Sequence, residues 1–306
     1  PGIIQVAAGK GFSIGKGGSL NISGDFANGK SDPRYTTDTY MRFGASAIHS
    51  ISPSSKATLT TSLSFNATRD WSGPDPSEPV QDVFDSTNET GFRVSHSGRF
   101  SLGKTIVNNL KYDISGSYKV TDSKSRNLIS GDTPFYDSLV EGMFDTNLLP
   151  HQYYGEGGSI GKPYSFFAKI SDVFHVGGER FSNRFNVGVQ YAIEGNAGTG
   201  FYNLDPLLPL SKSGYRPRDF SKIPALNTLS AYIEDNISVH FSSKDKYPMM
   251  TAQIGLRYEG IQLARPEGMS AFSPRINATI SPLQWMDIRI GYGRASKAPS
   301  LLMLYP

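Results

Sequence analysis

One triplet in the sequence carries residue types that hydrolases use. Asn236, Ser238 and His240 alternate with period two, so an extended strand would place all three side chains on one face. A serine nucleophile and its histidine base must approach to about 2.6–3.2 Å. Positions two apart on one strand are separated by about 6.6–6.8 Å, and no nucleophile motif surrounds the serine. The pattern therefore predicts no catalytic residues and a protein that is not an enzyme.

The sequence offers no recognisable metal or cofactor site. It has no cysteine, and its five histidines lack the spacing of metal ligands. The glycine-rich run from Gly9 to Gly17 looks like a phosphate-binding loop, but Lys10 stands at the first glycine position and Gly17 replaces the required Ser or Thr. We expect no metal and no cofactor, and we expect this run to form a mobile turn.

Two long polar segments, 121–162 and 195–227, combine aromatic rings with charged and amide groups. Aromatic plates beside carboxylates and arginine forks suit sugars, peptides or metal chelates as ligands. The alternative is that these loops pack on themselves and touch no ligand. The candidate ligand-binding residues are Tyr153, Tyr154, Tyr202, Asp205, Tyr215, Arg216, Arg218 and Asp219.

A further set of charged residues occupies every second position of segments whose other positions are apolar. Because both signs of charge occur there, this face must meet water or another polar body. It either docks a plug-like domain through charge pairs or is simply hydrated. The candidate lumen-facing residues are Glu234, Arg257, Arg275, Asp287 and Arg289.

Period two dominates the elements that must position these residues. In the segment 56–68, for example, Leu59, Leu63 and Phe65 share one face, while serines and threonines occupy the other. No comparable stretch carries a helical period. We predict twelve strands, at 3–9, 19–27, 40–51, 56–68, 91–102, 110–120, 163–174, 182–194, 228–242, 248–259, 272–281 and 285–295.

The lengths of the strands and connections indicate a membrane barrel. Many strands match the ~9–11 residues of a tilted membrane strand. Short connections such as 52–55 and 175–181 alternate with long ones such as 69–90 and 121–162, as in outer-membrane barrels. Aromatic residues near strand ends fit the two interfacial girdles: Trp285 by a short turn, and Tyr118, Tyr191, Tyr258 and Tyr292 by the long loops.

We therefore predict an all-β, antiparallel transmembrane barrel in the bacterial outer membrane, with lipid as a partner. His96 and Asp235 fall on the lipid-facing side, which requires either a bulge that shifts the phase or a position near an interface. The 30 basic and 27 acidic residues give a net charge of +3, too even for binding nucleic acid by charge. The alternatives are a passive porin-like channel and a soluble β-sandwich adhesin.

The last thirty-five residues carry a family resemblance. Phe272-Ser273-Pro274-Arg275 precedes a strand, and Tyr292-Gly293 leads to Lys297-Ala298-Pro299-Ser300-Leu301 and then Leu304-Tyr305. This pattern resembles the barrel of TonB-dependent outer-membrane receptors, except that Ser296 stands where an aromatic is usual. The segment 230–237 is similar to a recurrent strand of that barrel, and 216–225 resembles Bacteroidota members, including the starch-utilisation (SusC-like) type.

The resemblance implies active uptake of a scarce nutrient: a siderophore, haem, cobalamin, glycan or peptide. Such receptors have about twenty-two strands around an N-terminal plug, which an inner-membrane complex pulls through TonB. We thus expect residues 1–306 to be an internal part of a larger barrel, with plug and terminal strands elsewhere. The implied partners are the plug, the TonB complex acting through it, and a surface lipoprotein lid.

Overall fold

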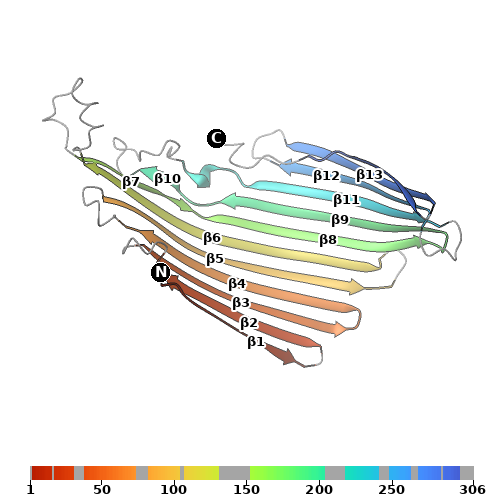
Figure 1. The fold of residues 1–306 in the computed structure, drawn as a ribbon, viewed down its shortest axis with the longest axis horizontal. Coiled ribbons are helices and arrows are strands. Elements are labelled where there is room, and N and C mark those ends of the chain that lie inside the picture. Colours follow the sequence, from red (N-terminus) through yellow and green to blue (C-terminus); the bar gives the residue numbers. More distant parts are fainter. Residues whose placement is uncertain are drawn as a thin grey trace, which may run out of the picture.

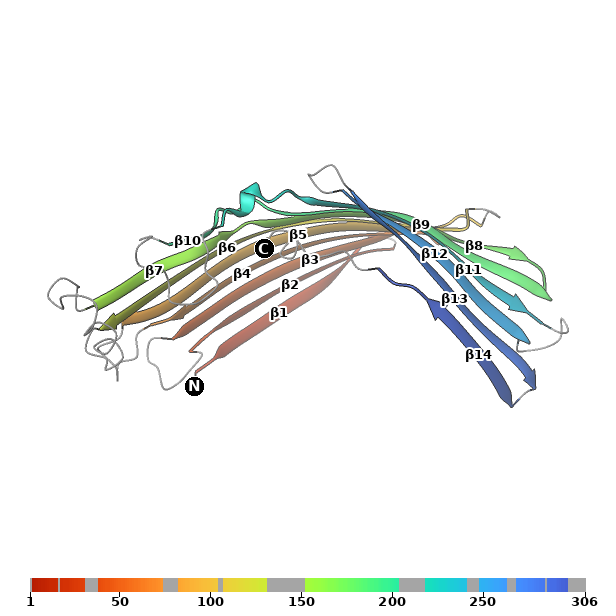
Figure 2. The same cartoon turned by 90° about the horizontal axis from the view of Figure 1, so that it is seen from above.

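A computed structural model places the described residues in one curved antiparallel sheet of fourteen strands. Figure 1 shows the strands side by side, and Figure 2 shows the sheet bent into an arch. The outermost strands β1 and β14 each pair with one neighbour, so the sheet is a part of a barrel wall and is not closed. The structure describes residues 2–15, 17–30, 38–73, 82–103, 107–130, 152–203, 218–240, 248–262, 268–283 and 285–296.

All twelve predicted strands are present, and most run longer than predicted. Their alternating apolar and polar residues suit a sheet that meets lipid on one face and water on the other. The strands are β1 Ile4–Ile14, β2 Gly18–Gly29, β3 Thr39–Ser54, β4 Ala57–Ser72, β5 Asp82–Ser101, β6 Asn109–Ser130, β8 Pro163–Gly177, β9 Phe181–Asn196, β11 Leu226–Val239, β12 Met250–Gln262, β13 Met269–Leu283 and β14 Met286–Gly293.

Two further strands lie in segments that the sequence analysis assigned to long loops. β7, Gln152–Gly161, pairs with the second half of β6, and β10, Gly200–Asn203, pairs with β7. The first half of β6 pairs with β8 instead. β6 therefore continues well beyond the part of the sheet that spans the membrane. All 20 residues of β5 pair with β6. Part of each long connection is ordered sheet rather than loop.

The glycine-rich run near the N-terminus is also mainly strand. Gly9 to Ile14 belong to β1 and pair in register with β2, so the prediction of a mobile turn across the whole run is wrong. The turn is confined to a few residues, where Gly15 and Gly17 adopt positive φ of 58° and 85°. Tight hairpins need such backbone angles, which glycine adopts without a steric cost.

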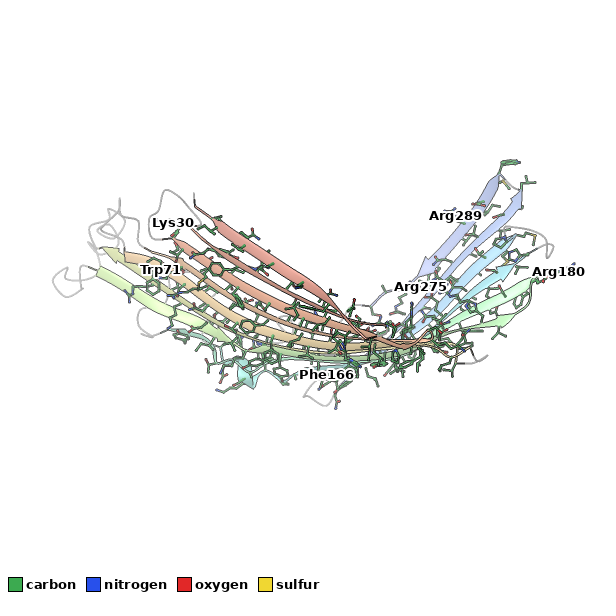
Figure 3. All side chains as sticks on the ribbon, turned by 90° about the horizontal axis from the view of Figure 1, so that it is seen from below. Lys30, Trp71, Phe166, Arg180, Arg275 and Arg289 are labelled. Atoms are coloured by element: carbon green, nitrogen blue, oxygen red, sulfur yellow. The ribbon has the colours of Figure 1, made fainter. Side chains whose placement is uncertain are left out.

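The two faces of the sheet differ as the period-two pattern requires. In Figure 3, Phe166 lies on the convex face, whereas Arg275 and Arg289 lie on the concave face. The registers, which shift only beside the short turns after β3 and β13, place aliphatic and aromatic side chains on the convex face of the wall strands, and many of them are exposed: Leu63 is 51% and Ile233 49% exposed. Exposed apolar side chains in such number belong against acyl chains.

A soluble β-sandwich is excluded as the fold of the described residues, which form a single sheet. A sandwich would bury the apolar faces of two sheets against each other. Among the described apolar residues, only Ala27, Leu226, Ala252 and Ile261 are buried. Stability in this wall comes from ladder hydrogen bonds and lipid contact instead of a dry core.

The only helical segment among the described residues is a single 3-10 turn, Phe220–Lys222. Within that part of the chain, no helix has the length and apolarity needed to cross a membrane.

Candidate functional site

The concave face of β11, β12 and β13 carries an ion pair at its centre. Arg275 Nη2 lies 2.5 Å from Glu234 Oε2, although the strand β12 separates the two residues. In the register of the three strands, Gly255 stands directly between them. The arginine crosses over β12 at Gly255 to reach the carboxylate, and a Cβ there would lie 3.7 Å from Arg275 Nε, an ordinary contact distance.

Amide side chains complete the coordination of Glu234. Gln253 Nε2 donates to Glu234 Oε1 at 2.8 Å, and Asn236 Nδ2 donates to the same oxygen at 3.4 Å. Asn277 Nδ2 in turn donates to Gln253 Oε1 at 3.3 Å. The carboxylate thus has an arginine on one oxygen and amides on the other, an arrangement that fixes it in position.

A second ion pair lies on the same face nearer the outer end of β12. Arg257 Nη2 is 3.3 Å from Glu259 Oε2 and donates to Ser230 Oγ at 3.4 Å. Ser230 is only 1% exposed, so this contact anchors the guanidinium to the wall. The predicted residues Glu234, Arg257 and Arg275 are therefore brought together by the fold.

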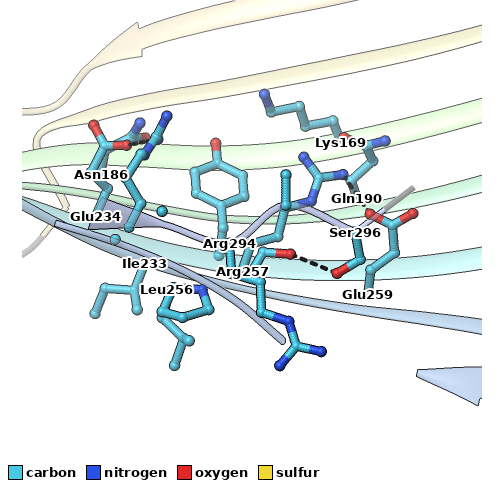
Figure 4. Close-up of a pocket in the computed structure, with 17 residues that line it drawn as sticks. Lys169, Asn186, Gln190, Ile233, Glu234, Leu256, Arg257, Glu259, Arg294 and Ser296 are labelled. Carbon is cyan, nitrogen blue, oxygen red and sulfur yellow. Dashed lines mark hydrogen bonds and ion pairs between the residues drawn. The ribbon is translucent and has the colours of Figure 1, made fainter. Parts of the chain in front are cut away.

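These two pairs border a hollow of about 970 Å³, shown in Figure 4. It is lined by four cationic side chains, Lys169, Arg257, Arg275 and Arg294, and two acidic ones, Glu234 and Glu259. Both acids are already paired with arginines, while Lys169 and Arg294 have no acidic partner among the described residues. The hollow therefore presents an excess of positive charge to whatever fills it.

Tyr232 forms part of the floor of the hollow. The tyrosine ring lies flat across the neighbouring strand at Gly188, where an added Cβ would approach Tyr232 ring atoms to 2.7 Å. Lys169 Nζ sits 5.3 Å from the centre of that ring, within the range of a cation–π contact. The glycine thus permits a flat aromatic surface inside a charged wall.

The predicted residues Asp287 and Arg289 lie on the same concave face but outside the hollow. Arg289 Nη2 is 3.3 Å from Asp287 Oδ2, and Ser281 Oγ donates to Asp287 Oδ1 at 2.7 Å. Both side chains are well exposed, so this pair on β14 is a separate, solvated feature.

Several residues in or beside the hollow were not among the sequence candidates. Gln190, Tyr232 and Glu259 line it, Gln253 donates to Glu234 at its border, and all four occupy inward positions of their strands. A charge-only search misses the neutral ones, and the period-two pattern would have found all four.

A second cluster of candidate residues lies where β10 meets the segment 218–222, beyond the outer end of the membrane-spanning strands. Phe201 and Arg218 exchange backbone hydrogen bonds of 2.9 and 3.1 Å, and the Phe201 and Phe220 rings meet edge to face at 5.3 Å. These contacts bring Tyr202, on β10, close to Arg218 and Asp219.

The side chain of Asp219 caps the 3-10 turn Phe220–Lys222. Its Oδ1 accepts hydrogen bonds from the Ser221 amide at 3.0 Å and from the Ser221 hydroxyl at 2.6 Å, so it caps the 3-10 turn. The hydrogen bond from the Ser221 hydroxyl lowers the pKa of Asp219 below its ordinary value. A carboxylate already committed to a cap is less free to bind a ligand.

The remaining loop candidates are only partly placed. The backbones of Tyr153 and Tyr154 lie in β7, opposite Ile129 and Leu128 of β6, and their side chains lie outside the described set. Asp205, Tyr215 and Arg216 lie outside the described residues.

The two polar residues expected on the lipid face are there, and no bulge places them there. β5 and β6 pair in unbroken register around His96, as β9, β11 and β12 do around Asp235. His96 Nδ1 and Nε2 meet Thr61 Oγ1 at 2.9 Å and the Tyr112 hydroxyl at 2.7 Å, which satisfies the imidazole within the wall.

Comparison with known proteins settles the family. A family model described as TonB dependent receptor-like, beta-barrel matches residues 14–306. The chain belongs to this family. Proteins of this family are outer-membrane receptors and transporters rather than enzymes, and the predicted outer-membrane location is confirmed. No curated protein matches the sequence.

Solved structures share the fold at low sequence identity. The siderophore receptor PiuA from Acinetobacter baumannii aligns with a TM-score of 0.58 and 12% identity over 94% of this chain and 47% of its own. A variant of the ferric enterobactin receptor PfeA from Pseudomonas aeruginosa gives 0.53 and 15% over 99% and 43%. The RagAB peptide transporter gives 0.54 and 12% over 94% and 36%. The chain spans less than half the length of these three relatives.

Proposed function

We propose that this TonB-dependent receptor chain is an internal part of the wall of an active importer. In this proposal residues 1–306 belong to a barrel of about twenty-two strands, and a plug domain fills the lumen. TonB and its inner-membrane complex act on the plug, so energy from the inner membrane drives uptake. The barrel wall holds the plug and the ligand and performs no covalent chemistry.

The observation that carries this proposal is the charged hollow on the concave face. A purely hydrated wall has no need of a carboxylate fixed by an arginine and two amides, as Glu234 is. Fixed charges of this kind suit a polar protein surface that must dock in one orientation. Because Lys169 and Arg294 lack acidic partners in the described chain, we expect an acidic segment of the plug to occupy the hollow.

The substrate is a scarce nutrient that reaches the barrel from outside: a siderophore, haem, cobalamin, glycan or peptide. The structural relatives include siderophore receptors and a peptide transporter, so metal chelates and peptides are the first classes to test. The proposed ligand-binding residues are Tyr153, Tyr154, Tyr202, Asp205, Tyr215, Arg216, Arg218 and Asp219. A surface lipoprotein lid is a further proposed partner, supported by the likeness to the RagAB transporter.

Uptake assays on the whole receptor test this function. Cells that express it should accumulate a radiolabelled candidate chelate or peptide, and accumulation should stop on deletion of TonB or addition of a protonophore. A passive porin-like channel would equilibrate the solute without either requirement. Uptake that survives both treatments would therefore refute active transport.

A charge-reversal pair tests the docking role of the hollow. Arg257→Glu adds an acid beside Glu259 inside the hollow, so we expect uptake to fall at least tenfold while the barrel still folds. Arg289→Glu makes the same change in charge on the same face but outside the hollow, so we expect nearly normal uptake. Equal losses in the two variants would contradict plug docking at this site.

A further inference from the structure

Two cationic side chains lie on the convex face beyond the last apolar positions of their strands. Arg69, on β4, is in phase with the lipid-facing Leu63 and stands opposite Asn88 of β5, which in turn stands opposite Asp122 of β6. Lys124 is two residues farther out on β6 and shares this face. Both cations are exposed, and neither has an acidic partner among the described residues.

The height of these cations follows from the outward positions of β4. From Ala57, beside the short periplasmic turn, to Ala67, these positions carry no charge. Ten residues with a rise of about 3.3 Å and a tilt of about 40° span about 25 Å, which is the height of the apolar band. Arg69 is the next outward residue and lies about 5 Å above the band. Lys124, one outward position farther along, lies about 10 Å above it.

A third cation continues the series along the long strands β5 and β6 (Figure 1). Arg126, two residues after Lys124, is half-buried, and its Cζ lies 4.8 Å from the centre of the Phe84 ring. This cation–π contact holds the guanidinium against the convex face. By the same rise per residue, Arg126 lies about 15 Å above the apolar band. Positive charge therefore occurs at three successive heights outside the hydrocarbon layer.

Acidic groups at this level do not neutralise the cations. Among the described side chains at the outward positions of β4, β5 and β6 beyond Ala67, only Asp122 is acidic; it forms no ion pair with Lys124, and its Oδ1 is buried. The side chain of Glu156, opposite Arg126, lies outside the described set. The outermost outward positions of β11, β12 and β13 are neutral: Asn227, Gly260, Gln262 and Ser270. The positive charge is therefore a feature of one sector of the outer rim.

This spacing of charge matches a ligand with anionic groups at several heights. A phospholipid head group extends only about 5–7 Å beyond the hydrocarbon core, so its single phosphate reaches Arg69 alone. The phosphorylated glycolipid of the outer leaflet carries a phosphorylated disaccharide above its acyl chains and further phosphates on the sugars above that. Guanidinium and ammonium groups bind such phosphates through charge-assisted hydrogen bonds. The exposed Asn88 amide beside Arg69 supplies neutral donors for sugar oxygens.

We propose that the convex rim of β4, β5 and β6 binds lipopolysaccharide, the phosphorylated glycolipid of the outer leaflet. Arg69 binds a phosphate at the head-group level, and Lys124 binds a second one about 5 Å farther from the bilayer. Strand spacing and rise put their Cα atoms about 12 Å apart, so the two cations bind separate phosphates of one molecule. Acyl chains lie against the apolar positions below Ala67. The site is outside the barrel and does not depend on plug docking or on what the receptor transports.

Lipid retention by the whole receptor tests the proposal. The protein is delipidated in mild detergent and incubated at low salt with equal amounts of a short-chain lipopolysaccharide, the same molecule after enzymatic dephosphorylation, and phosphatidylglycerol. Native mass spectrometry then counts each lipid that remains bound. We expect the phosphorylated lipopolysaccharide to exceed each of the others about tenfold, the effect of one charge-assisted hydrogen bond. The excess should shrink at high salt, because exposed charges are screened.

Charge-removing variants locate the effect. Arg69→Gln and Lys124→Gln should each lower retention of the phosphorylated form about three- to tenfold, and the double variant should lose the preference. Arg42→Gln is the matched control. It removes one positive charge at nearly the same height, but on the inward face of β3, where Arg42 Nε lies 3.2 Å from Asp25 Oδ2, and it should retain the preference. Heat-modifiable migration on gels verifies that each variant is folded.

Several outcomes would overturn the proposal. Equal retention of the dephosphorylated form by the wild type would show that the phosphates are not recognised. Equal retention of phosphatidylglycerol would make a phospholipid head group the occupant, and full displacement by an equal concentration of inorganic phosphate would reduce the rim to a site for free anions. A preference that persists in the folded double variant, or is lost equally in Arg42→Gln, would place the effect elsewhere on the receptor.

Discussion

The assignment of the convex face to lipid can be tested by placing one arginine at three positions of β4. Leu63 lies on the convex face, 51% exposed, between Ala47 of β3 and Val94 of β5. Its neighbour Ser62 points to the concave face, where its hydroxyl lies 2.6 Å from that of Ser95. Ala57 shares the convex face with Leu63 but is the first residue of the strand, next to a short turn.

The expected cost follows from depth. Leu63 is six residues beyond the start of β4. With a rise of about 3.3 Å per residue and a strand tilt of about 40°, its Cα lies about 15 Å above the short turn. The apolar band is about 25 Å tall, so this position lies near its middle. An arginine there costs about 2–4 kcal/mol, against about 0–1 kcal/mol near an interface. Leu63→Arg should therefore lower the folding equilibrium constant roughly 30- to 700-fold, because each 1.4 kcal/mol is a factor of ten.

Equilibrium unfolding in guanidinium, with the whole receptor in lipid vesicles and tryptophan fluorescence as the signal, measures these free energies. Ala57→Arg should cost under about 1 kcal/mol. Ser62→Arg should cost no more than the loss of one hydroxyl hydrogen bond, about 0.5–1.5 kcal/mol, because its guanidinium faces the polar interior. Equal destabilisation by Leu63→Arg and Ser62→Arg would refute the assignment of the two faces.

Three further predictions concern single contacts. Gly200→Ala should detach the 3-10 turn from β10, because φ there is +76° and a Cβ would collide with the carbonyl oxygen of Arg218; limited proteolysis should then cut near the turn in the variant but not in the wild type. The cap at Asp219 should hold above the ordinary carboxyl pKa and be lost as pH falls through the lowered pKa, because the hydrogen bond from Ser221 favours the ionised form. The Ser221 amide also donates to the carbonyl oxygen of Gly198 at 2.9 Å, so its hydrogen exchange, corrected for intrinsic rate, should speed up in acid without losing all protection, and Asp219→Asn should remove that pH dependence. Tyr112→Phe should cost about 1 kcal/mol by removing the hydroxyl at 2.7 Å from its imidazole partner on β5; an unchanged unfolding midpoint would show that the bond contributes nothing.

Most of the wall could be predicted from the sequence because its pattern is local. Alternation along a strand such as β4 assigns every side chain to a face, and the registers in the structure agree with that assignment. The faces of His96 and Asp235 were predicted correctly for the same reason. How His96 is satisfied was not predictable, because Thr61 and Tyr112 come from two different strands and their proximity depends on register.

The two missed strands show where local pattern fails. β7 contains four glycines in ten residues, and β10 has only four residues, so neither has the β-branched alternation of a strong strand. β7 is extended because β6 offers it a long unpaired edge. A partner supplied by tertiary structure overrides weak intrinsic preference.

The sequence predicts which face of the sheet the charged residues share, but it does not predict which of them are in contact. Period two places Glu234 and Arg275 on the inner side, but they belong to strands that are not neighbours. Their contact passes over Gly255, which stands between them at the matching register position. The loop candidates Tyr202 and Arg218 are brought near each other by one bridge between backbone segments, which the sequence does not reveal.

The length of β5 and β6 affects where a ligand would first contact the protein. These strands have 20 and 22 residues, about twice the number that a tilted strand needs to cross the bilayer. The surplus rises from the membrane as a hydrogen-bonded ribbon, with β7 continuing along its edge. If the protein is the importer proposed above, a nutrient molecule arriving from the medium would meet prearranged backbone there, and its capture would cost less conformational entropy than the folding of a flexible loop around it.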